Sequence, residues 1–130
     1  MNKTLKKNLI RIAHSYGVRC HFPKGLVIPY AYANRNLICI ADHDEKERLI
    51  ISEFFHELGH VMDYRNKVYP GYYKNKPTKK YLKRYAIRAE IHTDLTGKKL
   101  MSKHFPDMKF VYTYKYKKWQ KFAKMWWKIS

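Results

Sequence analysis

The sequence predicts an α+β fold in a single compact domain, and three observations favour it. Segments with helical periodicity lie on both sides of residues 18–40, which instead carry short strand-like runs. The chain has 130 residues, enough for one hydrophobic core but not for two independent domains. Hydrophobic residues make up 45% of the chain, which excludes a disordered polymer despite the net charge of +18.

The first helix is predicted over residues 2–16. Leu5, Leu9 and Ile12 recur there at the spacing of one apolar helix face. Gly17 follows at the position where a glycine commonly ends a helix.

Short strands are predicted within residues 18–40, which are rich in β-branched and aromatic side chains and are interrupted by prolines and a glycine. Leu37–Ile40 is the clearest strand, because a short apolar run is typical of a strand buried on both faces. Cys20 and Cys39 are too few for a disulfide framework, and Cys39 is interpreted as a small core residue.

The second helix is predicted over residues 46–64, after an acidic turn at residues 42–47 that suits the positive N-terminal end of a helix. Six apolar residues are expected on its buried side: Leu49, Ile50, Phe54, Leu58, Val61 and Met62.

Three further segments complete the predicted order. Residues 66–76 are expected to form a long surface loop, because they contain a proline, a glycine and the pair Tyr72-Tyr73. A third helix is predicted over residues 78–105, with Gly97 as a candidate break, and a last amphipathic helix over residues 115–129.

The second predicted helix contains the motif His56-Glu57-Leu58-Gly59-His60. Residues four apart lie on the same face of a helix, so His56 and His60 can hold one ion between them. Neutral imidazoles at this spacing suit zinc, and Glu57 can reach a water on the metal. The motif therefore predicts a metal site.

A catalytic zinc site uses three protein ligands, so the motif alone is incomplete. A histidine six residues after His60 would complete the metzincin motif, but that position is Asn66, and the motif's glycine position is Asp63. Glu90, on the third predicted helix, is the leading candidate for the third ligand. Asp94 lies one helical turn further and is expected to accept a hydrogen bond from a ligating imidazole.

Other interpretations of these residues stay open. Glu90 and Asp94 would form an ordinary surface pair if they only contacted Arg88 or Lys98. His92 competes as third ligand, although helical geometry points it away from the face that Glu90 and Asp94 share. In a purely structural protein the histidine pair would be accidental.

About half of the chain, from Leu37 to Met101, resembles the ImmA/IrrE-type zinc metallopeptidases, a gluzincin-like family of compact bacterial and phage proteins. The matching features are the strand Leu37–Ile40, the motif His56–His60, the pair Ala89-Glu90 and the ending Leu100-Met101.

The resemblance implies a zincin-like domain in which a small β-sheet packs on the motif helix and on the helix with the third ligand. It implies one zinc ion per chain, held by His56, His60 and Glu90, with Glu57 as the catalytic base. Proteases of this kind often add a tyrosine or histidine donor for the oxyanion, for which the sequence offers Tyr72, Tyr73 and Tyr112.

Positive charge is concentrated in the second half of the chain. Residues 1–73 contain 11 basic and 7 acidic side chains, whereas residues 74–130 contain 17 and 3. A C-terminal extension at about residues 106–130 alternates lysines with aromatic residues, the ingredients of single-stranded nucleic-acid binding. A nucleic acid or an acidic protein is therefore a candidate partner of the basic half. Two alternatives stay open: the aromatic residues cap the core while the lysines face water, or the segment is an amphipathic helix on a membrane surface.

These features predict a zinc-dependent endopeptidase that hydrolyses a specific, regulatory or DNA-associated protein through zinc-activated water. The alternative is a non-hydrolytic binding module that contacts nucleic acid or a protein partner through its basic half. No apolar run reaches the ~18 residues of a membrane span, and residues 1–12 lack a signal-peptide pattern. A cytoplasmic protein is therefore expected, and its small size and basicity suit a phage or mobile element.

Overall fold

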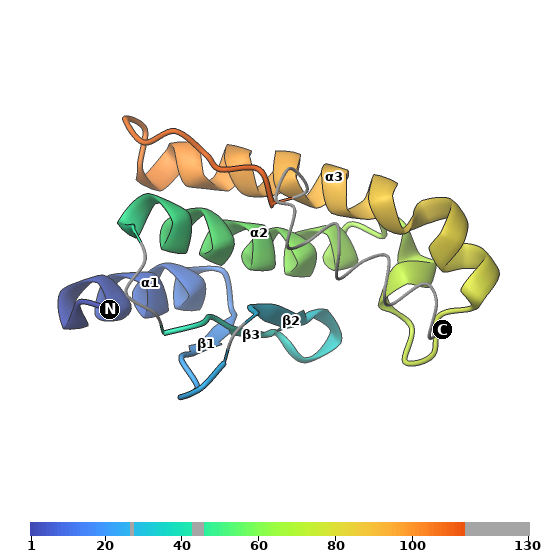
Figure 1. The fold of residues 1–130 in the computed structure, drawn as a ribbon, viewed down its shortest axis with the longest axis horizontal. Helices are drawn as coiled ribbons and strands as arrows, with labels where there is room; N and C mark the ends of the chain where they lie inside the picture. The colour runs from blue at the N-terminus through green and yellow to red at the C-terminus, as the bar shows by residue number, and fades with distance from the viewer. Residues whose placement is uncertain (27, 43–45, 114–130) are drawn as a thin grey trace.

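The computed structural model describes residues 1–26, 28–42 and 46–113. In these residues three α-helices and a three-stranded sheet confirm the predicted α+β class (Figure 1). In chain order, the elements are α1 (Lys3–Ser15), β1 (Arg19–His21), β2 (Tyr30–Tyr32), the 3₁₀ turn η1 (Ala33–Arg35), β3 (Leu37–Cys39), α2 (Glu47–Arg65), the 3₁₀ turn η2 (Pro70–Tyr73) and α3 (Lys79–His104).

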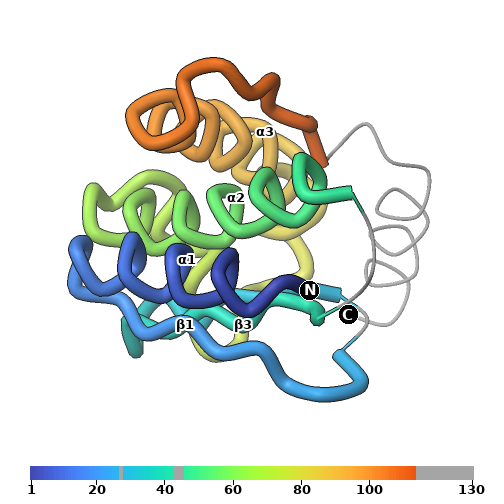
Figure 2. The backbone as a smooth tube through the Cα atoms, turned by 90° about the vertical axis from the view of Figure 1, so that its left-hand side faces the viewer, coloured from blue at the N-terminus to red at the C-terminus, as the bar shows by residue number. Residues whose placement is uncertain are grey.

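The helix α2 is the centre of the fold. It lies between α3 on one side and a layer made of α1 and the sheet on the other (Figures 1 and 2). Phe54, Phe55 and Leu58 are completely buried, because α2 has neighbours on both sides. Polar residues on α2 are consequently forced into the interior along with the apolar ones.

The helix α1 covers one end of the core and agrees with the predicted range. The side-chain oxygen of Asn2 accepts hydrogen bonds from the backbone N–H groups of Thr4 and Leu5, which caps the N-terminus. Gly17 follows the helix with a φ of +72°, a left-handed conformation that glycine adopts without strain. Leu9, on the inner face, is completely buried.

The sheet has the strand order β1-β3-β2, with β1 parallel and β2 antiparallel to β3. Cys20 and Ala31 both pair with Ile38, which is therefore enclosed from two sides. The central place of β3 explains why Leu37–Ile40 reads as a buried run, and this predicted strand is confirmed.

The two long helices approach closely at two glycines. A Cβ atom on Gly59 would lie 2.9 Å from the carbonyl oxygen of Thr93, and one on Gly97 would lie 2.7 Å from that of Phe55. The predicted break at Gly97 is wrong, because α3 continues through it. Glycine is needed at position 97 because the backbone of α2 occupies the space where a side chain would begin.

The segment between the long helices turns inward instead of forming only a surface loop. Gly71 in η2 is buried, and the ring of Tyr81 lies where its side chain would project. The prediction of a surface loop over residues 66–76 is therefore wrong for η2. This inward turn brings two tyrosines, Tyr72 and Tyr73, toward α2.

After α3 the chain runs back beside the two long helices (Figure 1). Phe110 is buried in the core, and the backbone N–H of Val111 donates to Oγ of Ser52, 3.0 Å away. The predicted last helix over residues 115–129 and most of the predicted extension lie outside the described residues. Among the described helices, none combines the length and apolar composition that crossing a membrane requires.

Candidate metal centre

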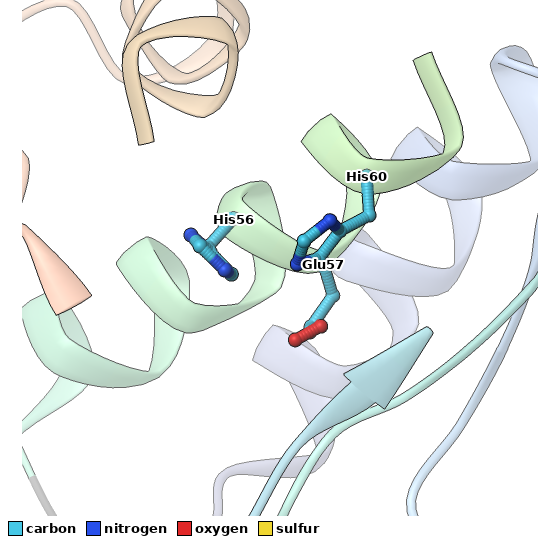
Figure 3. A group of neighbouring side chains, drawn as sticks. All are labelled: His56, Glu57 and His60. Atoms are coloured by element: carbon cyan, nitrogen blue, oxygen red, sulfur yellow. The ribbon is translucent and has the colours of Figure 1, made fainter. Parts of the chain in front are cut away.

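The motif residues form a buried group on one side of α2 (Figure 3). His56, Glu57 and His60 are 4%, 5% and 7% exposed, and each offers a donor atom within 4.8 Å of the others'. Buried polar groups need partners, and two imidazoles with a carboxylate are ordinary ligands of a transition metal. The group could therefore hold a metal ion.

A second carboxylate, from α3, meets both histidines of the motif. Oε1 of Glu90 lies 3.2 Å from Nε2 of His56, and Oε2 of Glu90 lies 3.0 Å from Nε2 of His60. Burial opposes ionisation of Glu90, but the contacts with His60 and His56 outweigh it and lower the pKa of the carboxyl group. Glu90 is thus held as an anion between two imidazoles.

Asp94 contacts His56 at Nδ1, the ring nitrogen that does not face Glu90. Oδ1 of Asp94 lies 2.7 Å from Nδ1 of His56, and Asp94 is completely buried. The hydroxyl of Thr113, at the C-terminal end of the described chain, donates to the same carboxylate oxygen at 2.9 Å. Burial would lower the pKa of His56, but hydrogen bonds with Asp94 and Glu90 raise it well above its usual value.

The other ring nitrogen of His60, Nδ1, contacts hydroxyl groups and not a carboxylate. This nitrogen lies 2.9 Å from the hydroxyl of Tyr73 and 3.3 Å from Oγ1 of Thr93. Thr93 in turn donates to Oδ2 of Asp63, which is 2.9 Å away and buried. An Asp63–Thr93–His60 chain therefore orients the second imidazole.

Asp63 has further partners on α3. Nδ1 of His92 lies 2.9 Å from Oδ2 of Asp63, and the hydroxyl of Thr96 donates to its Oδ1 at 2.7 Å. His92 thus contacts Asp63 and points away from the face of Glu90, as the helical geometry predicts. The sequence shows a signal for this cluster, since His92 and Thr96 are one turn apart and Asp63 is three residues after His60.

Glu57 differs from the other charged residues of the group. Its Oε2 atom is buried and has no hydrogen-bond partner in the described parts of the chain. Burial raises the pKa of the carboxyl group, and the neighbouring His60 and His56 only partly oppose this. A buried carboxylate oxygen without a partner, beside two imidazoles, fits a site that takes up a further group.

The tyrosines named as oxyanion candidates divide into two kinds. The hydroxyl of Tyr72 donates to Oε2 of Glu90 at 3.2 Å, and Tyr73 contacts His60. Tyr112 instead accepts a hydrogen bond from Lys98 on α3. The structure therefore brings two of the three tyrosines to the candidate metal centre, both from η2.

The remaining histidines lie elsewhere. His104 contacts the hydroxyl of Tyr16 at 2.9 Å, and His14 and His21 are exposed, whereas His43 lies outside the described residues. No family model, curated protein or solved structure matches the chain in the comparisons made.

Proposed function

We propose that this protein is a zinc-dependent endopeptidase of the ImmA/IrrE type. The observation that carries the proposal is the convergence of two imidazole Nε2 atoms on the two oxygens of Glu90, beside the unpartnered Oε2 of Glu57. Two histidines and a glutamate as ligands, with a second glutamate for proton transfer, suit metal-assisted peptide hydrolysis.

His56, His60 and Glu90 would hold one zinc ion per chain. Glu90 suits the third ligand position better than Glu57, because both of its oxygens already face the ring nitrogens and its pKa is lowered. Zinc bound there would supply a Lewis acid that lowers the pKa of water toward ~7. Asp94 and Thr93 keep the two imidazoles turned so that each Nε2 faces inward.

Glu57 has the properties of a general base. Its raised pKa places the carboxyl group closer to neutrality, where proton uptake and release are both accessible. In the proposed reaction Glu57 removes a proton from the attacking water and passes it to the leaving amine. Tyr72 and Tyr73, whose hydroxyls contact Glu90 and His60, are the proposed donors of a hydrogen bond to the carbonyl oxygen of the substrate.

The substrate class is a protein, and a regulatory or DNA-associated protein is favoured by the positive charge of the chain. A second candidate function is a non-catalytic binding module that keeps the metal only for its structure. The exposed cations of α3 are the observation that suggests it, because they can bind a partner without any hydrolysis. The two candidates differ in what they require of Glu57.

The first experiment measures zinc content in the purified protein and in two variants. About one zinc per chain is expected. Glu90→Gln should lose it, whereas His92→Ala should keep it, because His92 contacts Asp63 and not the motif. Circular dichroism confirms that each variant folds. An absence of zinc from the folded wild type, with metal supplied, would contradict the proposal.

The second experiment separates the enzyme from the binding module. Zinc-loaded wild type is incubated with a mixture of fluorescence-quenched peptides, and Glu57→Gln serves as the matched control. We expect cleavage by the wild type and a loss of about 10²–10⁴-fold in the variant, which should still bind zinc. Cleavage that persists in Glu57→Gln would reject the mechanism, and zinc binding without cleavage by either protein would favour the module.

A further inference from the structure

The helix α3 separates its charges by face. Its carboxylates, Glu90 and Asp94, are buried against α2 at 6% and 0% exposure. All eight of its lysines and arginines are exposed. Its exposed charged side chains are therefore all positive, although the helix contains both signs of charge.

A row of side chains defines this outer face of α3. Arg84, Arg88, Leu95 and Lys99 follow one another at intervals of four, seven and four residues, so they share one side of the helix. Glu90 belongs to the opposite side. With 26 residues the helix is about 39 Å long, so the cations extend over several turns.

The outer face has few carboxylates nearby to neutralise it. In the described part of the chain, no ion pair joins a lysine or arginine of α3 to a carboxylate. Among described residues 64–113, Asp107 is the only acidic residue that is exposed. Such a row attracts a polyanion, since like charges held along one rod are stabilised by an extended opposite charge.

We propose that the outer face of α3 binds the phosphate backbone of a nucleic acid. Regularly spaced phosphates match an extended row of lysines and arginines, and lysine in particular contacts phosphate as a point charge. Between the cations the row offers an apolar side chain, Leu95, and not an amide or carboxylate that reads base edges.

An acidic protein is the other class of polyanion, and the apolar side chains of α3 argue against it. Ile87 and Leu95 are 45% and 51% exposed but lie two turns apart, so they do not form a continuous patch. Protein interfaces depend on a central cluster of buried apolar or aromatic anchors surrounded by polar groups. The outer face has cations toward both ends, none between Arg88 and Lys98, and no such centre.

This inference does not rest on the proposed peptidase activity. The candidate metal centre lies between α2 and the inner side of α3, whereas Arg84, Arg88 and Lys99 lie on the opposite side of the same helix. Nucleic acid on the outer face would leave Glu57 and Glu90 untouched. A protein that bound no zinc or hydrolysed no peptide would therefore not contradict the nucleic-acid proposal. Likewise, a protein that bound no nucleic acid would not contradict the proposed peptidase activity.

The test is fluorescence anisotropy with the full chain and a labelled DNA duplex of about 20 base pairs, which exceeds the length of α3. The matching single strand and an RNA duplex distinguish the kinds of nucleic acid. Affinity is measured over a range of salt concentrations, because each phosphate contact adds about 0.9 to the slope of log K against log salt for duplex DNA.

Two triple variants carry the same change in net charge. Arg84→Ala, Arg88→Ala and Lys99→Ala together remove the cations of the outer face. Lys3→Ala, Lys7→Ala and Arg11→Ala remove three exposed cations of α1 and serve as the control.

We expect the α3 variant to bind DNA about 10–100-fold more weakly at about 0.1 M salt, with a slope smaller by about 2–3. The α1 variant should change both quantities much less. Equal losses in the two variants, or no binding by the wild type, would overturn the proposal. Binding of polyglutamate in preference to all three nucleic acids would also overturn it and identify an acidic protein surface as the partner.

Discussion

Asp94 holds His56 by the ring nitrogen that faces away from the metal group, with Oδ1 of Asp94 2.7 Å from Nδ1 of His56. A histidine that coordinates through Nε2 carries its proton on Nδ1, and a carboxylate at that nitrogen selects this tautomer. The contact is buried, so water does not compete for it. In the proposed zinc site, the tautomer of His56 would therefore depend on a residue on another helix.

Replacing Asp94 should weaken the metal site without removing a ligand. We expect Asp94→Asn to lower zinc affinity by about tenfold or more, because the amide removes the negative charge that makes His56 more basic. Competition with a chromogenic chelator measures the affinity. Asp107→Asn, which changes an exposed acid after α3, is the control and should have no effect. Equal affinities in both variants would show that the contact does not orient the ligand.

Replacing Asp63 should mainly lower the stability of the fold. The carboxylate of Asp63 contacts Nδ1 of His92 and accepts hydrogen bonds from the hydroxyls of Thr93 and Thr96. Removing the carboxylate leaves these three groups without their acceptor. We expect Asp63→Ala to lower the free energy of unfolding by about 1–3 kcal/mol, as measured by urea denaturation. Asp107→Ala should change it by less than about 0.5 kcal/mol. A stability like that of the wild type would mean that water replaces the carboxylate at no cost.

Gly97→Ala tests the close approach of the long helices. An alanine normally stabilises the interior of a helix by about 1 kcal/mol relative to glycine. Here its methyl group would meet the backbone of Phe55, so we expect a net loss of about 1–3 kcal/mol in thermal or urea denaturation. Ser102→Ala on the exposed side of α3 is the control. A gain in stability for Gly97→Ala would show that α2 and α3 separate easily.

The pair formed by Lys6 and Asp42 gives a prediction for pH. The hydrogen bond from Lys6 lowers the pKa of Asp42 below its usual value of 3.8. A lowered pKa in the folded state stabilises the protein above the unfolded pKa, and this contribution is lost as the pH falls through the folded value. Asp42→Asn should therefore cost about 0.5–1 kcal/mol at pH ~7, the small effect of an exposed pair, and progressively less as the pH falls below the unfolded pKa. A difference that is independent of pH would exclude this ion pair as the cause.

The local patterns of the chain predicted its elements well. The spacing of Leu5 and Leu9 gave α1, and the apolar run Leu37–Ile40 gave β3, because each pattern reports which side of an element is buried. The motif on α2 and Glu90 are also candidate ligands from the sequence alone, since few residue types bind metals, and the structure brings them together.

Contacts between distant segments could not be predicted in the same way. Gly97 is a helix breaker by propensity, and only the backbone of Phe55 explains why α3 needs it. Asp63 was interpreted only as a mismatch to a known motif, because its partner Thr93 is 30 residues away. The inward turn of η2 likewise depends on Tyr81, which packs against Gly71.

The close approach of α2 and α3 at Gly59 and Gly97 also determines what the segment between the two helices has to do. Since backbone packing fixes how α2 lies against α3, the covalent link between them is a tether and not a hinge. Exposed residues 74–76 could then be cut by a protease while the two pieces remain associated. His56 and Glu90 would stay together in a nicked molecule, held by the interface alone.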